Sequence, residues 1–180
     1  MGNRAEIVME QVQEVCGEDT YISITEKYGT IDGKAKPTAQ GKYIKNILME
    51  LNATQGEEVS KKVMRPCGYY CITKSTLEKA NKLYKDAKHN IENFLELLNT
   101  NDLAGGNLYS DNGDIMVVYN QCYCGIPKAT KDMPVNYCEC SVGWVECLFK
   151  SVFDKDVIVE KVQTIIGGSD RCVFRVSNFN

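Results

Sequence analysis

The stretch Ile115-Met116-Val117-Val118-Tyr119 separates two parts of the sequence that differ in character. An unbroken run of β-branched and aromatic residues is typical of a buried strand. Before it, apolar residues recur mostly at steps of three and four, which is the spacing of amphipathic helices. After it come strand-like residues 157–166 and 172–176, joined by a turn at 167–170. The pattern predicts an α+β fold, with a helical N-terminal half packed on a twisted, mostly antiparallel sheet.

Apolar spacing predicts helices at residues 4–15, from Pro37 to about residue 51, and from about residue 54 to a break near Arg65, because Pro66 disfavours an unbroken helix. The longest predicted helix runs from Ser75 to Leu98, about six turns with one apolar face. Ser141 is predicted to cap a last helix that reaches Phe153. Residues 17–36, with one short strand at most, 99–114 and 125–136 are predicted to be loops and turns.

A length of 180 residues fits one medium domain or two small ones. We predict an N-terminal helical segment over residues 1–57 and an α+β domain over residues 58–180. The sequence contains no repeat and no low-complexity linker between them. The two parts are therefore expected to form one compact body.

Charge and hydropathy exclude several classes of function. A net charge of −3 argues against binding to nucleic acid, and the single histidine, His89, excludes sites built from two or three imidazoles. The apolar runs fall well short of the roughly 20 residues that a membrane helix needs, so we expect no membrane partner. Residues 1–6 lack the apolar segment of a signal peptide. We therefore expect a cytoplasmic protein whose thiols are kept reduced.

Nine cysteines are many for a cytosolic chain of this length, and six of them form three close pairs. The paired residues are Cys67 with Cys71, Cys122 with Cys124, and Cys138 with Cys140. Such spacings put two thiols on one side of a helical turn or of a strand. In a reducing compartment, grouped cysteines favour metal ligation or reactive thiols over disulfides.

Zinc is the first choice of metal for these six thiols, because a structural zinc site is commonly formed by four cysteines. An iron–sulfur cluster is the alternative, although its usual C-x2-C runs are absent. Cys138 and Cys140 precede the predicted start of a helix at Ser141, whose N-terminal dipole would lower their pKa and favour thiolates. A purely structural metal and small buried thiols remain alternatives, the latter especially for Cys16 and Cys147.

One resemblance to a known family rests on residues 137–144, with the sequence YCECSVGW, and residues 165–176, with the sequence IIGGSDRCVFRV. These motifs resemble the C-terminal half of the V4R (4-vinyl reductase) superfamily, over roughly residues 58–177. The resemblance implies a V4R and Bet3-like α+β fold that encloses an apolar pocket for a small hydrophobic molecule. It also implies that Cys138 and Cys140 are zinc ligands, with Cys172 as a candidate third. The thiols of Cys67, Cys71, Cys122 and Cys124 go beyond that pattern.

A cytosolic small-molecule-binding or sensory protein with a thiolate zinc site is therefore the first functional hypothesis. Its ligand would contact the aromatic residues near the cysteines, which are Tyr69, Tyr70, Tyr123 and Trp144. Two alternatives remain open: a metal- or cysteine-dependent hydrolase with Glu139 or Glu146 as base, and an iron–sulfur or thiol redox protein. The sequence assigns no catalytic residue and favours binding over catalysis. A homodimer is possible.

Overall fold

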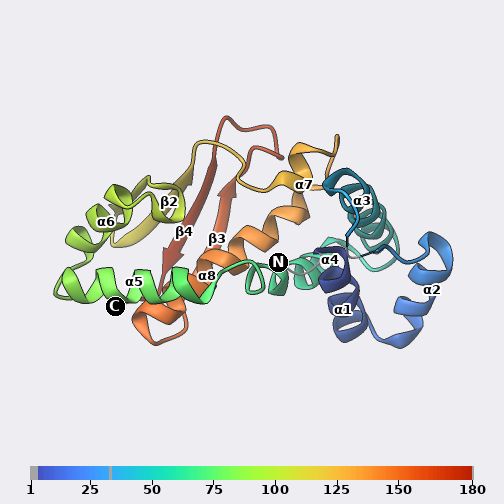
Figure 1. Ribbon diagram of the computed structural model, residues 1–180, viewed down its shortest axis with the longest axis horizontal. Coiled ribbons are helices and arrows are strands. Elements are labelled where there is room, and N and C mark those ends of the chain that lie inside the picture. The colour runs from blue at the N-terminus through green and yellow to red at the C-terminus, as the bar shows by residue number, and fades with distance from the viewer. Residues whose placement is uncertain (1–3, 33, 180) are drawn as a thin grey trace. The chain divides into compact units, whose positions relative to one another are not determined.

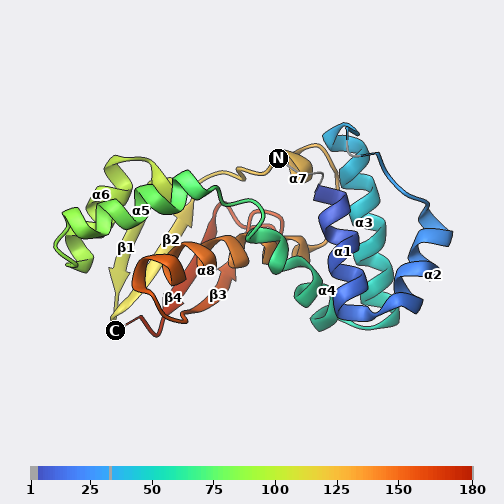
Figure 2. The ribbon, with the colours of Figure 1, turned by 60° about the horizontal axis from the view of Figure 1, so that its bottom comes forward.

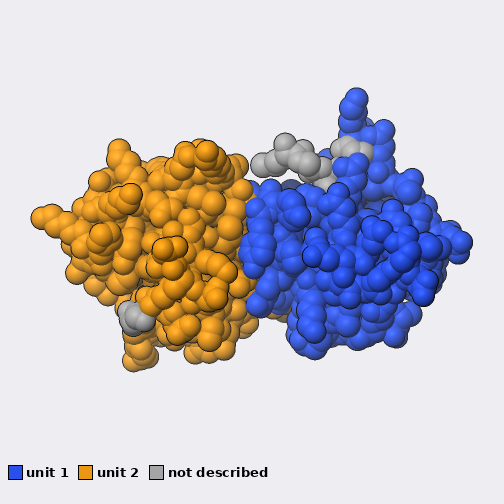
Figure 3. Space-filling view, turned by 90° about the horizontal axis from the view of Figure 1, so that it is seen from below, with its two compact units in different colours: residues 1–71, 124–140 blue, residues 72–123, 141–180 orange. Residues whose placement is uncertain are grey.

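The computed structural model describes residues 4–32 and 34–179, and the chain divides into two compact units (Figure 3). Unit 1 comprises residues 1–71 and 124–140, and unit 2 comprises residues 72–123 and 141–180. Unit 1 is helical, whereas unit 2 carries a four-stranded antiparallel sheet, so the fold is α+β as predicted. The expected boundary between residues 57 and 58 coincides with none of the boundaries between these units.

Unit 1 is a group of helices in which α1 and α3 lie side by side and α2 and α4 pack against them (Figure 2). Its elements are α1 (Arg4–Cys16), α2 (Glu18–Tyr28), α3 (Pro37–Thr54), α4 (Glu57–Met64), η1 (Pro66–Gly68), α7 (Gly125–Lys128) and η3 (Val135–Cys138). Pro37 and Pro66 each stand at the first position of their helix, where proline has no amide bond to lose. The fully buried side chains of Val8, Ile47 and Leu48 belong to the core of this unit.

Unit 2 contains the sheet, in the strand order β1-β2-β4-β3 (Figure 1). Its elements are α5 (Lys74–Asp86), α6 (Ile91–Thr100), η2 (Leu103–Gly105), β1 (Leu108–Asp111), β2 (Asp114–Tyr119), β3 (Ile158–Gln163) and β4 (Cys172–Ser177), with most of α8 (Glu139–Phe153). Alternate residues of β2 and β4, such as Val117 and Phe174, face one core together with apolar residues of α5, α6 and α8. The sheet is thus covered by helices of its own unit.

All three predicted loops contain regular structure, because residues 125–136 include α7 and the start of η3. Residues 18–28 form α2, although two isoleucines and two threonines in it are β-branched residues of low helix propensity. Two acidic residues in its first turn favour the helix, and the buried Ile24 packs it against the unit. Residues 108–111 form strand β1, which pairs with β2 in a hairpin whose short exposed sequence lacks an alternating pattern. Contacts with the rest of the unit therefore determine both elements: packing of Ile24 for α2, and pairing with β2 for β1.

The predicted helix from Ser75 to Leu98 is two helices, and its first cap is Thr73 rather than Ser75. The chain turns at Lys88 and His89, whose φ angles are 53° and 59°, and Asn90 then caps α6 by accepting the amide hydrogen of Asn93. Rings of Tyr84 and Phe94, 5.0 Å apart, pack together across the break. Because the apolar face continues across it, periodicity alone did not reveal the turn.

Candidate functional site

Four of the six predicted ligand thiols gather in unit 1 around the guanidinium of Arg4. Arg4 Nη1 donates a hydrogen bond to Cys140 Sγ over 2.7 Å. Cys71 lies against the same pair, and it interacts with both Cys140 and Arg4. Cys67 and Cys124 are close enough to act electrostatically on Arg4 or to be affected by it. The centre of this cluster is therefore a cation that the sequence analysis did not single out.

The other thiols are placed differently. Cys138 is buried at the end of η3, two residues before Cys140. Cys122 belongs to unit 2, where it lies near Cys172 and raises the pKa of that thiol, which burial also raises. Cys172 Sγ accepts a hydrogen bond from the amide of Ile165 at 3.4 Å. The six predicted ligand thiols are thus divided between the two units, five in unit 1 and Cys122 in unit 2.

Each member of the Arg4 cluster is positioned by a different element. Arg4 begins α1, whose residues Val8 and Val12 are fully buried and hold that helix in the unit. Cys71 follows the turn after η1, where its amide bonds to the carbonyl of Gly68. Cys140 is the second residue of α8, which starts at Glu139 and not, as predicted, at Ser141. Three segments that are distant in sequence therefore supply the cation and the two thiols in contact with it.

The segment that carries Cys140 is fixed by polar contacts on successive residues. The side-chain amide of Asn136 donates to Asn52 Oδ1 at 2.7 Å and to Ser60 Oγ. The hydroxyl of Tyr137 is hydrogen-bonded to Cys124 Sγ at 3.2 Å. The carboxylate of Glu139, which is buried, accepts a hydrogen bond from Arg65 Nη2 at 3.2 Å. Such contacts define a single position for Cys140 Sγ.

The electrostatics separate the two contacting thiols. The thiol of Cys140 donates to Cys71, which raises the pKa of Cys140 well above its ordinary value, and burial adds to the effect. The same hydrogen bond, helped by the charge of Arg4 and opposed by burial, lowers the pKa of Cys71 to about 6. The prediction that a helix N-terminus would lower the pKa of Cys140 was wrong, because its donated hydrogen bond and its burial outweigh the dipole. At neutral pH the pair carries one negative charge, on Cys71.

The pKa of Arg4 is shifted in the opposite direction to that of Cys71. Burial disfavours its charged form, but the neighbouring thiols Cys140, Cys71 and Cys124 and the phenol of Tyr137 raise its pKa above the ordinary value. The thiol of Cys67 has a pKa raised to about 12, chiefly by burial, and it donates to the carbonyl of Val63 at 3.5 Å. Among Cys67, Cys71 and Cys140, Cys71 is thus the thiol whose pKa is lowered.

The cluster does not fit the predicted zinc site. Within residues 4–32 and 34–179, no three cysteine, histidine, aspartate or glutamate side chains are arranged to hold one metal ion. In addition, the guanidinium of Arg4 is hydrogen-bonded to Cys140 Sγ, and its positive charge would repel a divalent cation bound by that sulfur. Zinc and iron–sulfur binding stay predictions.

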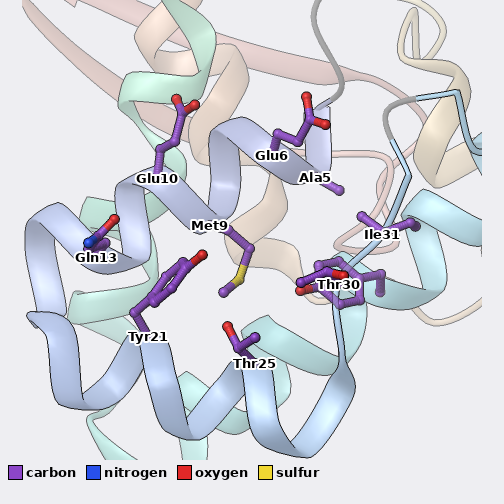
Figure 4. Close-up of a pocket in the computed structure, with 10 residues that line it drawn as sticks. Ala5, Glu6, Met9, Glu10, Gln13, Tyr21, Thr25, Thr30 and Ile31 are labelled. Atoms are coloured by element: carbon purple, nitrogen blue, oxygen red, sulfur yellow. The ribbon is translucent and has the colours of Figure 1, made fainter.

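The predicted ligand-binding aromatics do not meet in one unit. Tyr69 and Tyr70 lie beside Cys71 in unit 1 and are exposed. Tyr123 is exposed in unit 2, and Trp144 of α8 packs against the core there. A different cavity exists in unit 1, with a volume of about 210 Å³, next to α1 (Figure 4). Half of its ten lining residues belong to α1, and the others come from α2, α3 and the loop between them.

Comparisons with known proteins assign the chain to a family. A family model described as a family of unknown function, DUF6144, matches residues 3–180. The chain belongs to the DUF6144 family. No curated protein matches it significantly. The family match does not bear on the resemblance to the V4R superfamily, which stays a prediction. Of membrane association, the described part of the chain shows only that none of its helices is long and apolar enough to span a bilayer.

Proposed function

We propose that the DUF6144 protein is a thiol redox protein in which Cys71 and Cys140 exchange electrons with disulfide substrates. The observation that carries this proposal is the contact of the two thiols beside the partly buried Arg4. In the reducing cytosol that the sequence predicts, a contacting thiol pair is more often catalytic or sensing than structural. This is the thiol redox alternative of the sequence analysis.

Cys71 is the attacking thiol. It is half-buried and reachable, whereas Cys140 is buried, with 8% of its surface exposed. The lowered pKa of Cys71 makes it a thiolate at neutral pH, and the thiolate is the nucleophile in disulfide exchange. The hydrogen bond from Cys140 and the charge of Arg4 stabilise this form.

The reaction proceeds in two exchanges. The Cys71 thiolate attacks one sulfur of a substrate disulfide, so that a mixed disulfide forms and the first substrate thiolate leaves. Cys140 then attacks Cys71 Sγ, its proton passes to the second leaving thiolate, and a Cys71–Cys140 disulfide remains. Two electrons move from the protein dithiol to the substrate disulfide, and two substrate thiols are released. A dithiol reductant reverses the sequence.

The experiment incubates the reduced full-length protein with oxidised glutathione and maps disulfides by peptide mass spectrometry. We expect a Cys71–Cys140 disulfide in the wild type and a stable glutathione adduct on Cys71 in the Cys140→Ser variant, which cannot resolve it. The Cys147→Ser variant serves as a matched control and should behave like the wild type, because Cys147 lies in unit 2.

Other outcomes reject the proposal. Failure of Cys71 to react before the other cysteines would show that it is not the attacking thiol. A disulfide that joins other cysteines would show that the contact seen here is not the redox pair. Elemental analysis of the same reduced sample tests the metal hypotheses. One zinc per chain, lost when Cys71 and Cys140 are replaced together, would favour the zinc site over the redox pair.

A further inference from the structure

The guanidinium of Arg4 connects the thiol pair to helix α1. Arg4 is the first described residue of α1, and its side chain reaches Cys140 on α8. The groups that stabilise its charge are Cys140, the phenol of Tyr137, Cys71 and Cys124, and among them Cys71 is the thiol whose pKa is lowered, to about 6. The first turn of α1 is therefore tied to the rest of unit 1 through the negative charge of the reduced pair.

Oxidation removes that charge. In the Cys71–Cys140 disulfide neither sulfur is a thiolate, and a disulfide sulfur is a poor acceptor for a guanidinium. A buried charge that loses its partner is strongly unfavourable, so Arg4 gains by turning toward water. Because Arg4 is already partly exposed, this needs a movement of the first two turns of α1 and not of the whole helix.

Helix α1 also forms one wall of the cavity in unit 1. Met9 points toward Tyr21 and Thr25 of α2, while the carboxylates of Glu6 and Glu10 point away from them (Figure 4). The hydroxyl oxygen of Thr25 is enclosed and has no hydrogen-bond partner among the described residues. A shift of the first turns of α1, which carry Ala5 and Met9, would open this wall to water.

We propose that oxidation of the Cys71–Cys140 pair releases Arg4, loosens the first two turns of α1, and opens the cavity that α1 lines. This inference rests on the proposed function, since it requires the disulfide to form. It makes the cavity responsive to the redox state of the thiols. The fully buried Val12 keeps the remainder of α1 in place.

Hydrogen–deuterium exchange of the full-length protein tests the proposal, with peptides of α1 compared with peptides of α3 in the same sample. The first four amides of a helix have no partner within it, so the informative amides run from Val8 to Val12. We expect these amides to exchange about tenfold or more faster in the disulfide form than in the dithiol form. Exchange in α3 should change less than about twofold.

Variants test whether the disulfide and Arg4 are the causes of faster amide exchange in α1. In Cys71→Ser the oxidant should leave α1 exchange unchanged, because this variant has neither the thiolate nor the disulfide of the pair. In Arg4→Gln the exchange of α1 should be the same in both redox states, whereas Lys27→Gln, which removes an exposed basic residue that pairs with Glu50 in the same unit, should keep the wild-type response. The wild-type and Cys71→Ser comparison stands even if Arg4→Gln folds poorly.

The outcomes distinguish this proposal from the one on which it rests. A mapped Cys71–Cys140 disulfide with unchanged α1 exchange would overturn the release of α1 and leave the redox function intact. Absence of the disulfide would overturn both. A redox response that persists in Arg4→Gln would show that the signal does not pass through Arg4.

Discussion

The thiols of the two units have opposite environments. In unit 1, Cys71 and Cys140 contact each other and an arginine, and the segment that carries Cys140 is fixed by buried polar side chains. In unit 2, Cys147 and Cys172 belong to elements with an apolar core, and burial raises the pKa of both. The number of cysteines therefore says little about chemistry. A nearby cation and a second thiol determine which of them is reactive.

The cores of the two units also differ, since that of unit 2 is apolar and that of unit 1 includes buried polar contacts. Unit 2 is held by an apolar cluster with several phenylalanine rings, such as the stacked pair Phe149 and Phe153. Unit 1 adds to its apolar core a buried polar contact among Asn52, Ser60 and Asn136. Apolar packing tolerates small shifts, whereas hydrogen bonds specify positions. A polar network is thus suited to hold a reactive thiol in place.

The largest expected effect tests the apolar side of this comparison. Phe174→Ala removes a fully buried ring from unit 2 and should lower the free energy of unfolding by about 3–5 kcal/mol. The control is Tyr109→Ala on β1, whose ring is exposed and whose loss should cost less than about 1 kcal/mol. Urea denaturation measures both.

Thiol chemistry should be unaffected by Phe174→Ala under native conditions. The alkylation rate of Cys71 in the folded variant is expected to match the wild type, because Phe174 lies in the core of the other unit. A strong change in that rate without unfolding would mean that the thiol site depends on the core of unit 2.

A smaller effect tests the polar side. Asn136→Ala removes the amide that donates to Asn52 and Ser60 and leaves buried polar groups with fewer partners, at a cost of about 1–3 kcal/mol. Asn107→Ala is the matched control, since the amide of this exposed residue bonds only locally, to the carbonyl of Gly105. Thermal unfolding measures the stability of the two variants. Equal decreases in the free energy of unfolding would contradict a special role for the buried network.

The sequence predicted the fold class because its strongest patterns were sufficient for that purpose. The buried strand around Val117, the hairpin that ends in residues 172–176 and the helix that starts at Pro37 are all present. Each is defined by its own apolar periodicity or by a proline. The break at Lys88 and His89 was missed because it interrupts the backbone without interrupting the apolar face.

The candidate site was predicted only in part. Cysteine spacing drew attention to Cys71 and Cys140 as metal ligands, but it paired each with its neighbour in sequence. Their contact with each other depends on how α1, η1 and α8 come together, which no local pattern encodes. Arg4 gave one faint signal: it is a basic residue at the start of a helix whose next charged residues, Glu6 and Glu10, are acidic. That feature is too common to identify a site.

The pH dependence of Cys71 gives an effect on reactivity rather than on folding. Its lowered pKa, about 6, predicts that the rate of alkylation by iodoacetamide rises up to about pH 7 and is then nearly constant. Arg4, Cys140 and Cys67 are the titratable groups near it. Arg4→Gln should raise this pKa and slow the reaction at pH 7 by about tenfold, while Lys27→Gln should not.

The sign of the accompanying stability change follows from linkage. The pKa of Cys71 is lower in the folded protein than the ordinary value of 9.0. Its stabilising contribution to the free energy of unfolding is therefore fully present above about pH 9 and is lost as the pH falls through 6. Cys67 acts in the opposite sense, since its pKa is raised to about 12 and its contribution disappears only as the pH rises through that value. In the alkylation experiment, a rate of reaction with iodoacetamide that keeps rising up to about pH 9 would show that Cys71 is an ordinary thiol.

The smallest effect is expected for the thiols outside the cluster. Cys16 and Cys147 are half-buried, and burial is the main cause of their raised pKa. Replacing either with serine keeps a small polar side chain in place and should change the free energy of unfolding by less than about 1 kcal/mol. Both variants should still form the Cys71–Cys140 disulfide at the wild-type rate. If Cys147→Ser slowed that oxidation, the reactive pair would extend into unit 2, and the contrast between the two sets of thiols would have to be abandoned.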